Sequence, residues 1–113
     1  MIRRILLKKN VDKILDLLDK EGELFFGQIL RKTGINPSNL TILLTDLQLE
    51  GLIAKEEKSD YEGGRVKSYY KITDKGRQAR YILKIMDMID SLKEGQKLKC
   101  LIVDDNTETP IVV

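Results

Sequence analysis

Histidine is absent from this sequence, and cysteine occurs only once, at position 100. A single cysteine cannot form an internal disulfide, and a chain without histidine lacks the usual structural zinc sites and the Ser–His and Cys–His catalytic pairs. Cys100 lies in the apolar stretch LKCLIV, which favours a small buried or interface side chain over a redox role or an intermolecular disulfide. We expect no metal, no cofactor and no catalytic residues.

Long hydrophobic runs are also missing. The basic N-terminus MIRRILLKKN contains only the short apolar run Ile5–Leu7, which does not reach the length of a signal-peptide core. The uncharged stretch Ile35–Thr45 is interrupted by Asn, Pro, Ser and Thr, so it does not suit a membrane span. The expected protein has no membrane partner and is cytoplasmic, associated with the nucleoid if its source is prokaryotic or viral.

Positive charge is missing from the C-terminus, because residues 100–113 carry Asp104, Asp105 and Glu108 but no basic residue. Removing these three from the 18 acidic residues leaves 15, against 20 basic ones, so the rest of the chain is more basic than the overall net charge of +2. That balance permits a polyanionic partner without demanding one. A length of 113 residues with 42% hydrophobic and 34% charged residues predicts one globular domain.

The N-terminal part of the chain has helical periodicity, with apolar and charged residues on opposite faces. The apolar face consists of Val11, Ile14, Leu15, Leu17 and Leu18. Gly22 is placed to end this helix. Its start is open: Asn10 is a good cap, but Ile2, Ile5 and Leu6 could continue the apolar face. We favour a continuous or nearly continuous helix from Ile2.

A minimal strand and two further helices follow. Residues 23–26, ELFF, could form the strand, and the next residues, 27–34, predict a short helix with Ile29 and Leu30 facing inward and Gly34 in a tight turn. Asn36 as a cap and Pro37 at the first helical position begin the next helix, which has about 14 residues and spans about 21 Å. The buried stripe of this helix consists of Leu40, Leu43, Leu44 and Leu47.

From Leu52 onward the pattern is that of strands. Residues 52–73 predict two strands around a turn whose tip is YEGGR, residues 61–65. Thr73 and Asp74 then cap a final helix of about 20 residues, about 30 Å long. The tail, residues 96–113, could form a short strand followed by a flexible acidic end, and it could also dock on the domain or on a partner.

Two stretches resemble the winged-helix transcriptional regulators of the MarR, PadR and ArsR type. SNLTILLTDLQLEGLI, residues 38–53, is similar to the recognition helix of these regulators, and YKITDKG, residues 70–76, resembles their Y-x-[LI]-T-x-x-G junction between wing and helix. The resemblance implies an α+β, mostly helical fold: a winged helix-turn-helix with a long C-terminal dimerisation helix. The implied organisation is a winged helix-turn-helix DNA-binding domain at 1–73, a dimerisation helix of the same domain at 74–95, and the tail.

The resemblance also implies that the second helix of the pair lies in the major groove of double-stranded DNA. Asparagine and glutamine can pair with adenine there, and threonine or isoleucine methyls can contact thymine. The predicted base-contacting residues are Ser38, Asn39, Thr41, Ile42, Thr45 and Gln48. Because this helix has no Arg or Lys and carries Asp46 and Glu50, an ordinary helix-compatible surface stays an alternative.

Contacts to DNA phosphates are expected from basic residues outside the recognition helix. The predicted residues are Arg31, Lys32, Lys55, Lys58, Arg65 and Lys67. Acidic residues are interleaved with the wing cations, so a solvated, charge-balanced hairpin is the alternative at the wing. The basic N-terminal residues Arg3, Arg4, Lys8 and Lys9 are equally compatible with phosphate contacts and with simple exposure.

The final helix has two apolar stripes, of which only one is needed to cover the domain's own core. The second would be exposed on a monomer, and an apolar patch of that size favours a homodimer. The predicted dimerisation residues are Tyr81, Ile82, Ile85, Met86, Met88, Ile89 and Leu92. The alternative is that the stripes pack on the N-terminal helix and on the tail.

Together these features predict a DNA-binding protein that is not an enzyme. The sequence has no glycine-rich phosphate loop and no paired acids in an apolar setting. We expect a dimeric transcriptional regulator that binds double-stranded DNA with some sequence preference and represses by occupying its site. The alternative is a winged-helix protein-interaction module or adaptor that does not bind DNA.

Overall fold

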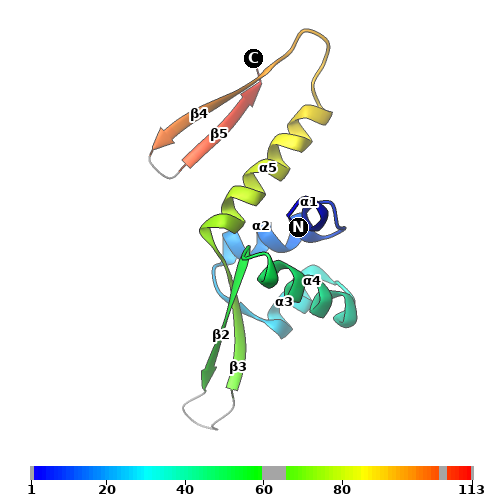
Figure 1. Ribbon diagram of the computed structural model, residues 1–113, viewed down its shortest axis with the longest axis vertical. Coiled ribbons are helices and arrows are strands. Elements are labelled where there is room, and N and C mark those ends of the chain that lie inside the picture. The colour runs from blue at the N-terminus through cyan, green and yellow to red at the C-terminus, as the bar shows by residue number, and fades with distance from the viewer. Residues whose placement is uncertain (1, 60–65, 105–106, 113) are drawn as a thin grey trace. The chain divides into compact units, whose positions relative to one another are not determined.

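The computed structural model describes residues 2–59, 66–104 and 107–112 (Figure 1). The chain divides after Arg80 into two units. The first contains α1 (Ile2–Leu6), α2 (Val11–Glu21), β1 (Leu24–Phe25), α3 (Phe26–Thr33), α4 (Pro37–Leu49), β2 (Ile53–Ser59), β3 (Val66–Ile72) and the first turns of α5 (Asp74–Asp90). The predicted order of elements is confirmed from α2 to α5.

The N-terminal helix differs from the prediction, because the continuous helix that the apolar spacing favoured is broken into α1 and α2. Asn10 has a φ of 72°, in the left-handed region, and its side chain does not cap α2. Asparagine tolerates this conformation better than most residues, but a helix cannot continue through it. The break allows both Ile5 and Val11 to be buried, and the sequence pattern does not show this gain in packing.

Three antiparallel strands form a small sheet in the order β1-β3-β2. Leu24 pairs with Tyr70 and Ile53 with Ile72, and all four side chains are buried. Neighbouring residues of a strand point to opposite faces of the sheet, so the residues next to the buried Leu24 and Tyr70 lie on the outer face. Phe25 and Tyr69 are therefore paired on that outer face.

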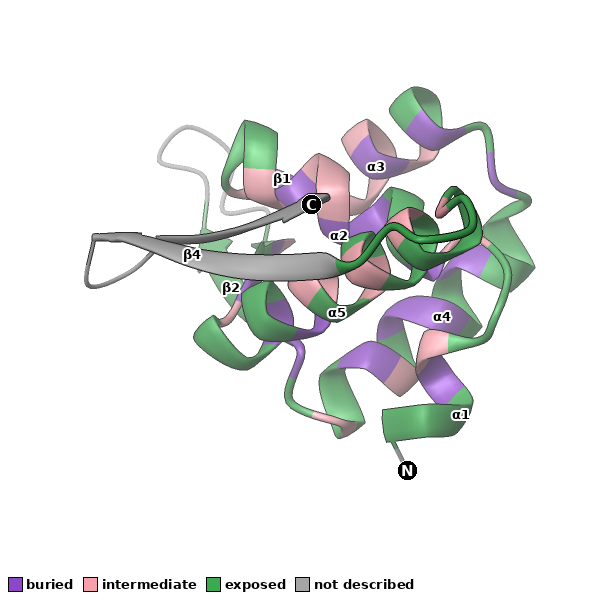
Figure 2. Ribbon diagram, turned by 90° about the horizontal axis from the view of Figure 1, so that it is seen from above, coloured by how far each residue is buried: buried purple, intermediate pink, exposed green. Residues whose placement is uncertain are grey.

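The core of the first unit lies between the helices and the inner face of the sheet. α2, α3 and α4 supply most of its fully buried side chains, which Figure 2 shows as purple stretches between exposed green ones. The buried stripe predicted on α4 is confirmed, because Leu40, Leu43, Leu44 and Leu47 are all buried. Burying one such leucine stabilises the fold by about 2 kcal/mol, so this stripe holds α4 firmly against the core.

The junction between the wing and α5 explains the threonine and glycine of the YKITDKG stretch. The Thr73 backbone N–H donates to the Leu52 carbonyl at 3.1 Å, and its hydroxyl donates to the Gly51 carbonyl at 2.6 Å. The same hydroxyl accepts from the Gly76 N–H at 3.0 Å, which caps α5. A Cβ on Gly76 would lie 2.0 Å from the Leu52 carbonyl oxygen, so only glycine fits here.

The second unit begins at Tyr81 and contains the rest of α5 and the tail. α5 ends at Asp90, short of the predicted boundary at 95, and the Ser91 and Leu92 N–H groups donate to the Met88 and Ile89 carbonyls three residues back. Beyond it, β4 (Leu98–Asp104) and β5 (Thr107–Val112) form an antiparallel pair. The sequence predicted one short strand and a flexible acidic end, and the second strand is a correction to that expectation.

Candidate nucleic-acid interface

The predicted recognition helix is α4, and its N-terminus is fixed as the sequence predicted. Gly34 has a φ of 69° and turns the chain between α3 and α4. The Asn36 carboxamide oxygen accepts from the Ser38 N–H at 2.9 Å, and Pro37 occupies the first helical position. Since a cap contributes about 1 kcal/mol, the start of α4 is set locally as well as by packing.

The outward face of α4 contains all six predicted base-contacting residues, and every one of them is exposed. The Thr41 hydroxyl donates to the Pro37 carbonyl at 3.0 Å and the Thr45 hydroxyl to the Thr41 carbonyl at 2.8 Å. Both threonines therefore use their proton within the helix, and what they offer outward is a methyl group and an acceptor oxygen. Asn39 and Gln48 retain the carboxamide groups that can pair with a base edge.

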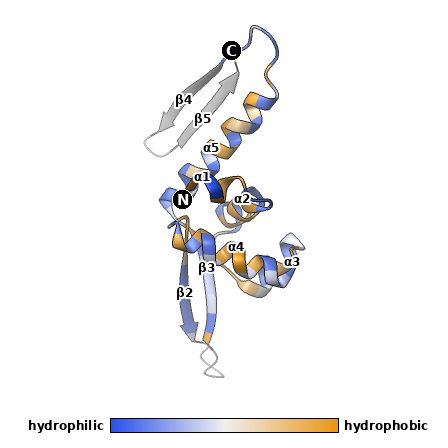
Figure 3. Cartoon of the chain, turned by 45° about the vertical axis from the view of Figure 1, so that its right-hand side comes forward, coloured by the Kyte–Doolittle hydropathy of each residue, from blue (hydrophilic) through white to orange (hydrophobic). Residues whose placement is uncertain are grey.

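Two apolar side chains are exposed on the same helix. Ile42 is 55% exposed and Leu49, two turns further on, is 80% exposed. Ile42 is among the contact residues predicted from the sequence and Leu49 is not, although their spacing of seven places both on one face. In Figure 3, α4 is coloured largely hydrophobic whereas β2 is largely hydrophilic.

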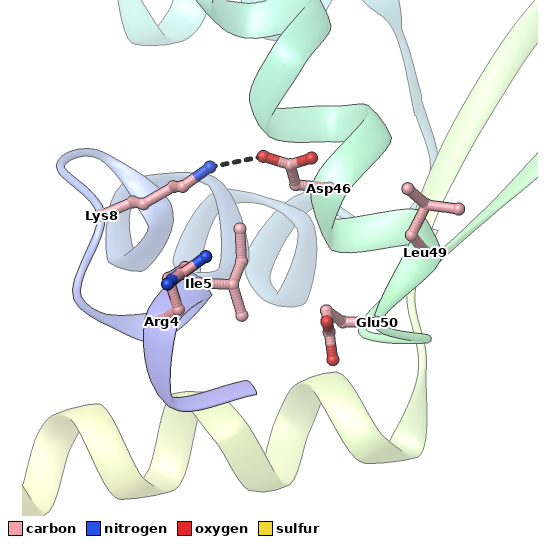
Figure 4. Close-up of a pocket in the computed structure, with 6 residues that line it drawn as sticks. All are labelled: Arg4, Ile5, Lys8, Asp46, Leu49 and Glu50. Atoms are coloured by element: carbon pink, nitrogen blue, oxygen red, sulfur yellow. Dashed lines mark hydrogen bonds and ion pairs between the residues drawn. The ribbon is translucent and has the colours of Figure 1, made fainter. Parts of the chain in front are cut away.

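Asp46 of α4 and Glu50, the residue after the helix, line a pocket together with residues of α1. The Lys8 ammonium nitrogen is 2.5 Å from the Asp46 carboxylate, and the two side chains are 40% and 33% exposed. Figure 4 shows this pair at one side of an open pocket of about 240 Å³. The residues that line the pocket are Arg4, Ile5, Lys8, Asp46, Leu49 and Glu50. The structure thus brings the N-terminal basic residues to the C-terminal half of α4, which sequence spacing alone could not show.

The basic residues at the end of α3 are exposed, as predicted. Lys32 forms an ion pair of 3.4 Å with Glu21, while Arg31 has no ion pair within the described part of the chain. An exposed pair of this kind contributes about 0–1 kcal/mol, so Lys32 can exchange Glu21 for a phosphate at little cost.

The wing carries an aromatic and basic cluster on its outer face. The Phe25 and Tyr69 rings meet edge to face with their centroids 6.0 Å apart. Lys58 and Lys67 are directly opposite in the β2–β3 register, and their ammonium groups lie 5.3 Å from the Tyr69 centroid and 4.7 Å from the Phe25 centroid. The Lys58 ammonium also pairs with the Glu23 carboxylate at 2.6 Å.

The wing cations predicted to contact phosphates therefore differ in their availability. The hydrogen bond to the Glu23 carboxylate raises the pKa of Lys58 and partly neutralises its charge for an external partner. Lys55 and Lys67 are exposed and have no ion pair among the residues that the structure describes. Arg65, at the tip, lies outside the described residues. The role of Glu23 was not predicted, because it precedes its partner Lys58 by 35 residues.

The predicted dimerisation residues of α5 fall into two groups. Ile82, Met86 and Ile89 are exposed, and Tyr81, Ile85, Met88 and Leu92 are half-buried. Ile82, Met86 and Ile89 are separated by four and three residues, the spacing of one helix face, so the exposed group forms one stripe.

The described residues contain no group of three or more Asp, Glu, Cys or His side chains placed to hold a metal ion. Among the described helices, none combines the length and hydrophobicity that crossing a bilayer requires.

Comparison with known proteins shows the same fold and a family. The sequence profile described as the TFIIE alpha subunit matches residues 1–99. The chain is similar to an uncharacterized HTH-type transcriptional regulator of Methanocaldococcus jannaschii, with 37% identity over 87% of this chain and 90% of the relative. A second, uncharacterized protein of that organism is 36% identical over 92% of this chain and 86% of its own length.

Solved structures of bacterial regulators are similar in fold. A MarR-family regulator from Enterococcus faecalis has a TM-score of 0.67 at 20% identity, over 80% of this chain and 79% of that one. A PadR-family regulator from Clostridium difficile has a TM-score of 0.62 at 17% identity, over 73% of this chain and 91% of that one. The predicted fold class, a mostly helical winged helix-turn-helix, is confirmed, and the C-terminal helix α5 is shorter than predicted.

Proposed function

The chain belongs to the TFIIE alpha subunit family, and from this membership we propose that it is a transcriptional regulator that binds double-stranded DNA through α4 and the β2–β3 wing. The observation that carries this proposal is the division of α4 into two faces. Four leucines on one side are buried, and all six predicted contact residues on the other are exposed. A helix held rigidly with a free polar face is what major-groove binding requires.

The chemistry of the exposed face suits a modest sequence preference. Asn39 and Gln48 can each form two hydrogen bonds with adenine, and the Ile42 side chain can contact a thymine methyl. Without arginine, α4 lacks the commonest means of reading guanine. We therefore propose that the protein prefers A·T-rich sites.

Phosphate contacts by Arg31, Lys32, Lys55 and Lys67 would position α4 without reading sequence. If about six phosphates are neutralised per dimer, affinity falls by about a factor of 10³ between 50 and 200 mM salt. We propose a homodimer formed through α5, which would place the two α4 helices about 34 Å apart on a palindromic site. Repression would then follow from occupancy of that site inside the cell.

The test is selection of duplexes from a random pool, followed by fluorescence anisotropy on the selected sequence at stepped salt concentrations. Asn39→Ala and Ile42→Ala should each weaken binding to the selected duplex by about tenfold and leave binding to random duplex unchanged, because a base contact is worth about 1–3 kcal/mol. Gln78→Ala, at an exposed position of α5 outside α4, is the control and should change neither affinity. Equal losses on both duplexes would contradict base readout.

A second candidate function has its own supporting observation. α4 has no basic residue and exposes Ile42 and Leu49, a composition that also suits a helix docking on an apolar protein groove. If the wild-type protein fails to bind any duplex at 50 mM salt, the protein-interaction function takes the place of DNA binding.

A further inference from the structure

If α4 enters a groove of DNA, the acidic residues in its C-terminal part would repel the phosphates. The segment around α1 is placed to reduce this repulsion. α4 contains no Lys or Arg, but Asp46 is on the helix and Glu50 follows its last residue. Asp46 adjoins Thr45, and only one residue separates it from Gln48, two of the predicted contact residues. A bare carboxylate at this position would repel the phosphate backbone.

The segment around α1 places a positive charge next to Asp46 of α4. Ile5 is buried, which anchors α1 on the core of the first unit. The Lys8 N–H donates to the Ile5 carbonyl at 3.1 Å, so the chain turns directly after α1. The Lys8 ammonium then reaches the Asp46 carboxylate at 2.5 Å (Figure 4).

A second cation, Arg4 within α1 itself, is available at the same place. Arg4 lines the pocket together with Lys8 and Asp46, and its side chain is exposed. Arg4 has no ion pair with any residue that the structure describes. An exposed guanidinium without a partner of its own is well suited to bind a phosphate with two parallel hydrogen bonds.

We propose that α1 is part of the DNA-contacting surface, where Lys8 neutralises Asp46 and Arg4 binds the phosphate backbone beside the C-terminal half of α4. This inference rests on the proposed DNA-binding function and adds a surface that the wing and the α3–α4 pair do not include. It also assigns Lys8 a role different from phosphate binding: its charge is used to cancel a carboxylate of the same chain.

The Lys8–Asp46 pair adds little to folding, since exposed ion pairs stabilise weakly. Its removal therefore leaves a folded protein in which DNA binding can be measured. A cycle of Lys8→Ala, Asp46→Asn and the double variant separates the two roles. All are compared by anisotropy on one duplex, with Lys97→Ala, an exposed lysine outside the first unit, as the control for loss of one charge.

We expect Lys8→Ala to weaken duplex binding about threefold, because it exposes the Asp46 charge near the phosphates. The double variant, which has neither charge, should regain the affinity of the wild type. Arg4→Ala should reduce the slope of log K against log salt by about one, as expected for the loss of one phosphate contact. Lys97→Ala should change neither quantity.

The outcomes that overturn the inference are distinct from failure of DNA binding itself. Binding by the wild type that is unchanged in both Lys8→Ala and Arg4→Ala would refute the role of α1 and leave the proposed function standing. A Lys8→Ala loss that Asp46→Asn does not restore would show that Lys8 contacts phosphate directly and would refute its neutralising role. Absence of duplex binding by the wild type would refute both proposals.

Discussion

Arg80 on α5 donates hydrogen bonds from Nε and Nη2 to the same carboxylate oxygen of Asp16 on α2, at 3.1 and 2.6 Å. Its Nη1 lies 3.0 Å from the Asp19 carboxylate, and Arg77, one turn earlier, lies 3.3 Å from Asp19. Two arginines thus join two aspartates across sixty residues of chain. These bonds fix the first turns of α5 on α2 within the first unit.

This relationship predicts a pH dependence of stability. The hydrogen bond from Arg80 lowers the pKa of Asp16, with a smaller effect in the same direction from Lys20, while partial burial acts in the opposite direction. A carboxyl whose pKa is lower in the folded state stabilises the fold above its unfolded pKa and loses that effect as the pH falls through the folded pKa. Asp16→Asn should therefore cost about 1 kcal/mol at pH 7 and progressively less below about pH 4.

The measurement is the urea midpoint of wild type and Asp16→Asn at pH 7 and pH 3. Asp87→Asn serves as the control, because Asp87 is exposed and has no ion pair in the described part of the chain. A difference between wild type and Asp16→Asn that stays constant across this pH range would show that the charge of Asp16 is not what stabilises the junction.

A second prediction concerns the glycine at the start of α5. Gly76→Ala should destabilise the fold by about 2 kcal/mol or more, because the new Cβ would lie 2.0 Å from the Leu52 carbonyl oxygen and 2.7 Å from the Ile72 side chain. Backbone atoms cannot move away as a flexible side chain can. Thermal unfolding followed by circular dichroism measures the effect, and Gln78→Ala, at an exposed position of the same turn, should change the midpoint little. Similar midpoints for the two variants would refute the tight contact.

The local features of the fold differ in how well the sequence predicts them. The cap at Asn36 and the turn at Gly34 were predicted because each depends on residues close together in the chain. The Thr73–Gly76 junction was identified from the family resemblance, since its contacts are with Gly51 and Leu52. The break at Asn10 was missed because the gain that compensates for it, burial of Ile5 and Val11, comes from tertiary packing. Local periodicity contains no information about that packing.

The candidate interface was predictable to the same degree. The outward face of α4 follows from its buried stripe, so its six residues could be identified before the structure was known. The pairs Lys8–Asp46 and Lys58–Glu23 join residues more than thirty positions apart, and no spacing rule connects them. The sequence therefore indicated which cations exist, but only the structure shows which are already paired.

A third prediction uses the pair at the wing. Glu23→Gln should release Lys58 and raise affinity for a duplex about twofold to threefold at low salt, because the ammonium group becomes available to phosphates. Glu57→Gln removes the same charge from a position of β2 adjacent to Lys58 that belongs to the other face of the strand. Anisotropy titrations of both variants should give the larger gain for Glu23→Gln. Equal gains would mean that only net charge matters and that Lys58 does not contact DNA.

The fourth prediction concerns the exposed stripe of α5. If the chain is a homodimer formed through this helix, Ile82→Glu with Met86→Glu should give a species of the chain mass, 13.0 kDa, where the wild type sediments at twice that mass. Buried carboxylates without partners are costly enough to separate such an interface. Lys84→Gln, an exposed polar change between the two positions, should leave the mass of the wild type unaltered.

The same α5 variants also test how dimerisation and DNA binding are linked. A dimer binds two half-sites at once, so the second contact is intramolecular and strengthens binding to a palindrome far more than to a single half-site. The double variant should therefore bind a palindrome and a half-site with nearly equal affinity, whereas the wild type should prefer the palindrome by about a hundredfold or more. A wild type that sediments as a monomer, or that shows no such preference, would refute the dimeric mode of action while leaving binding by α4 intact.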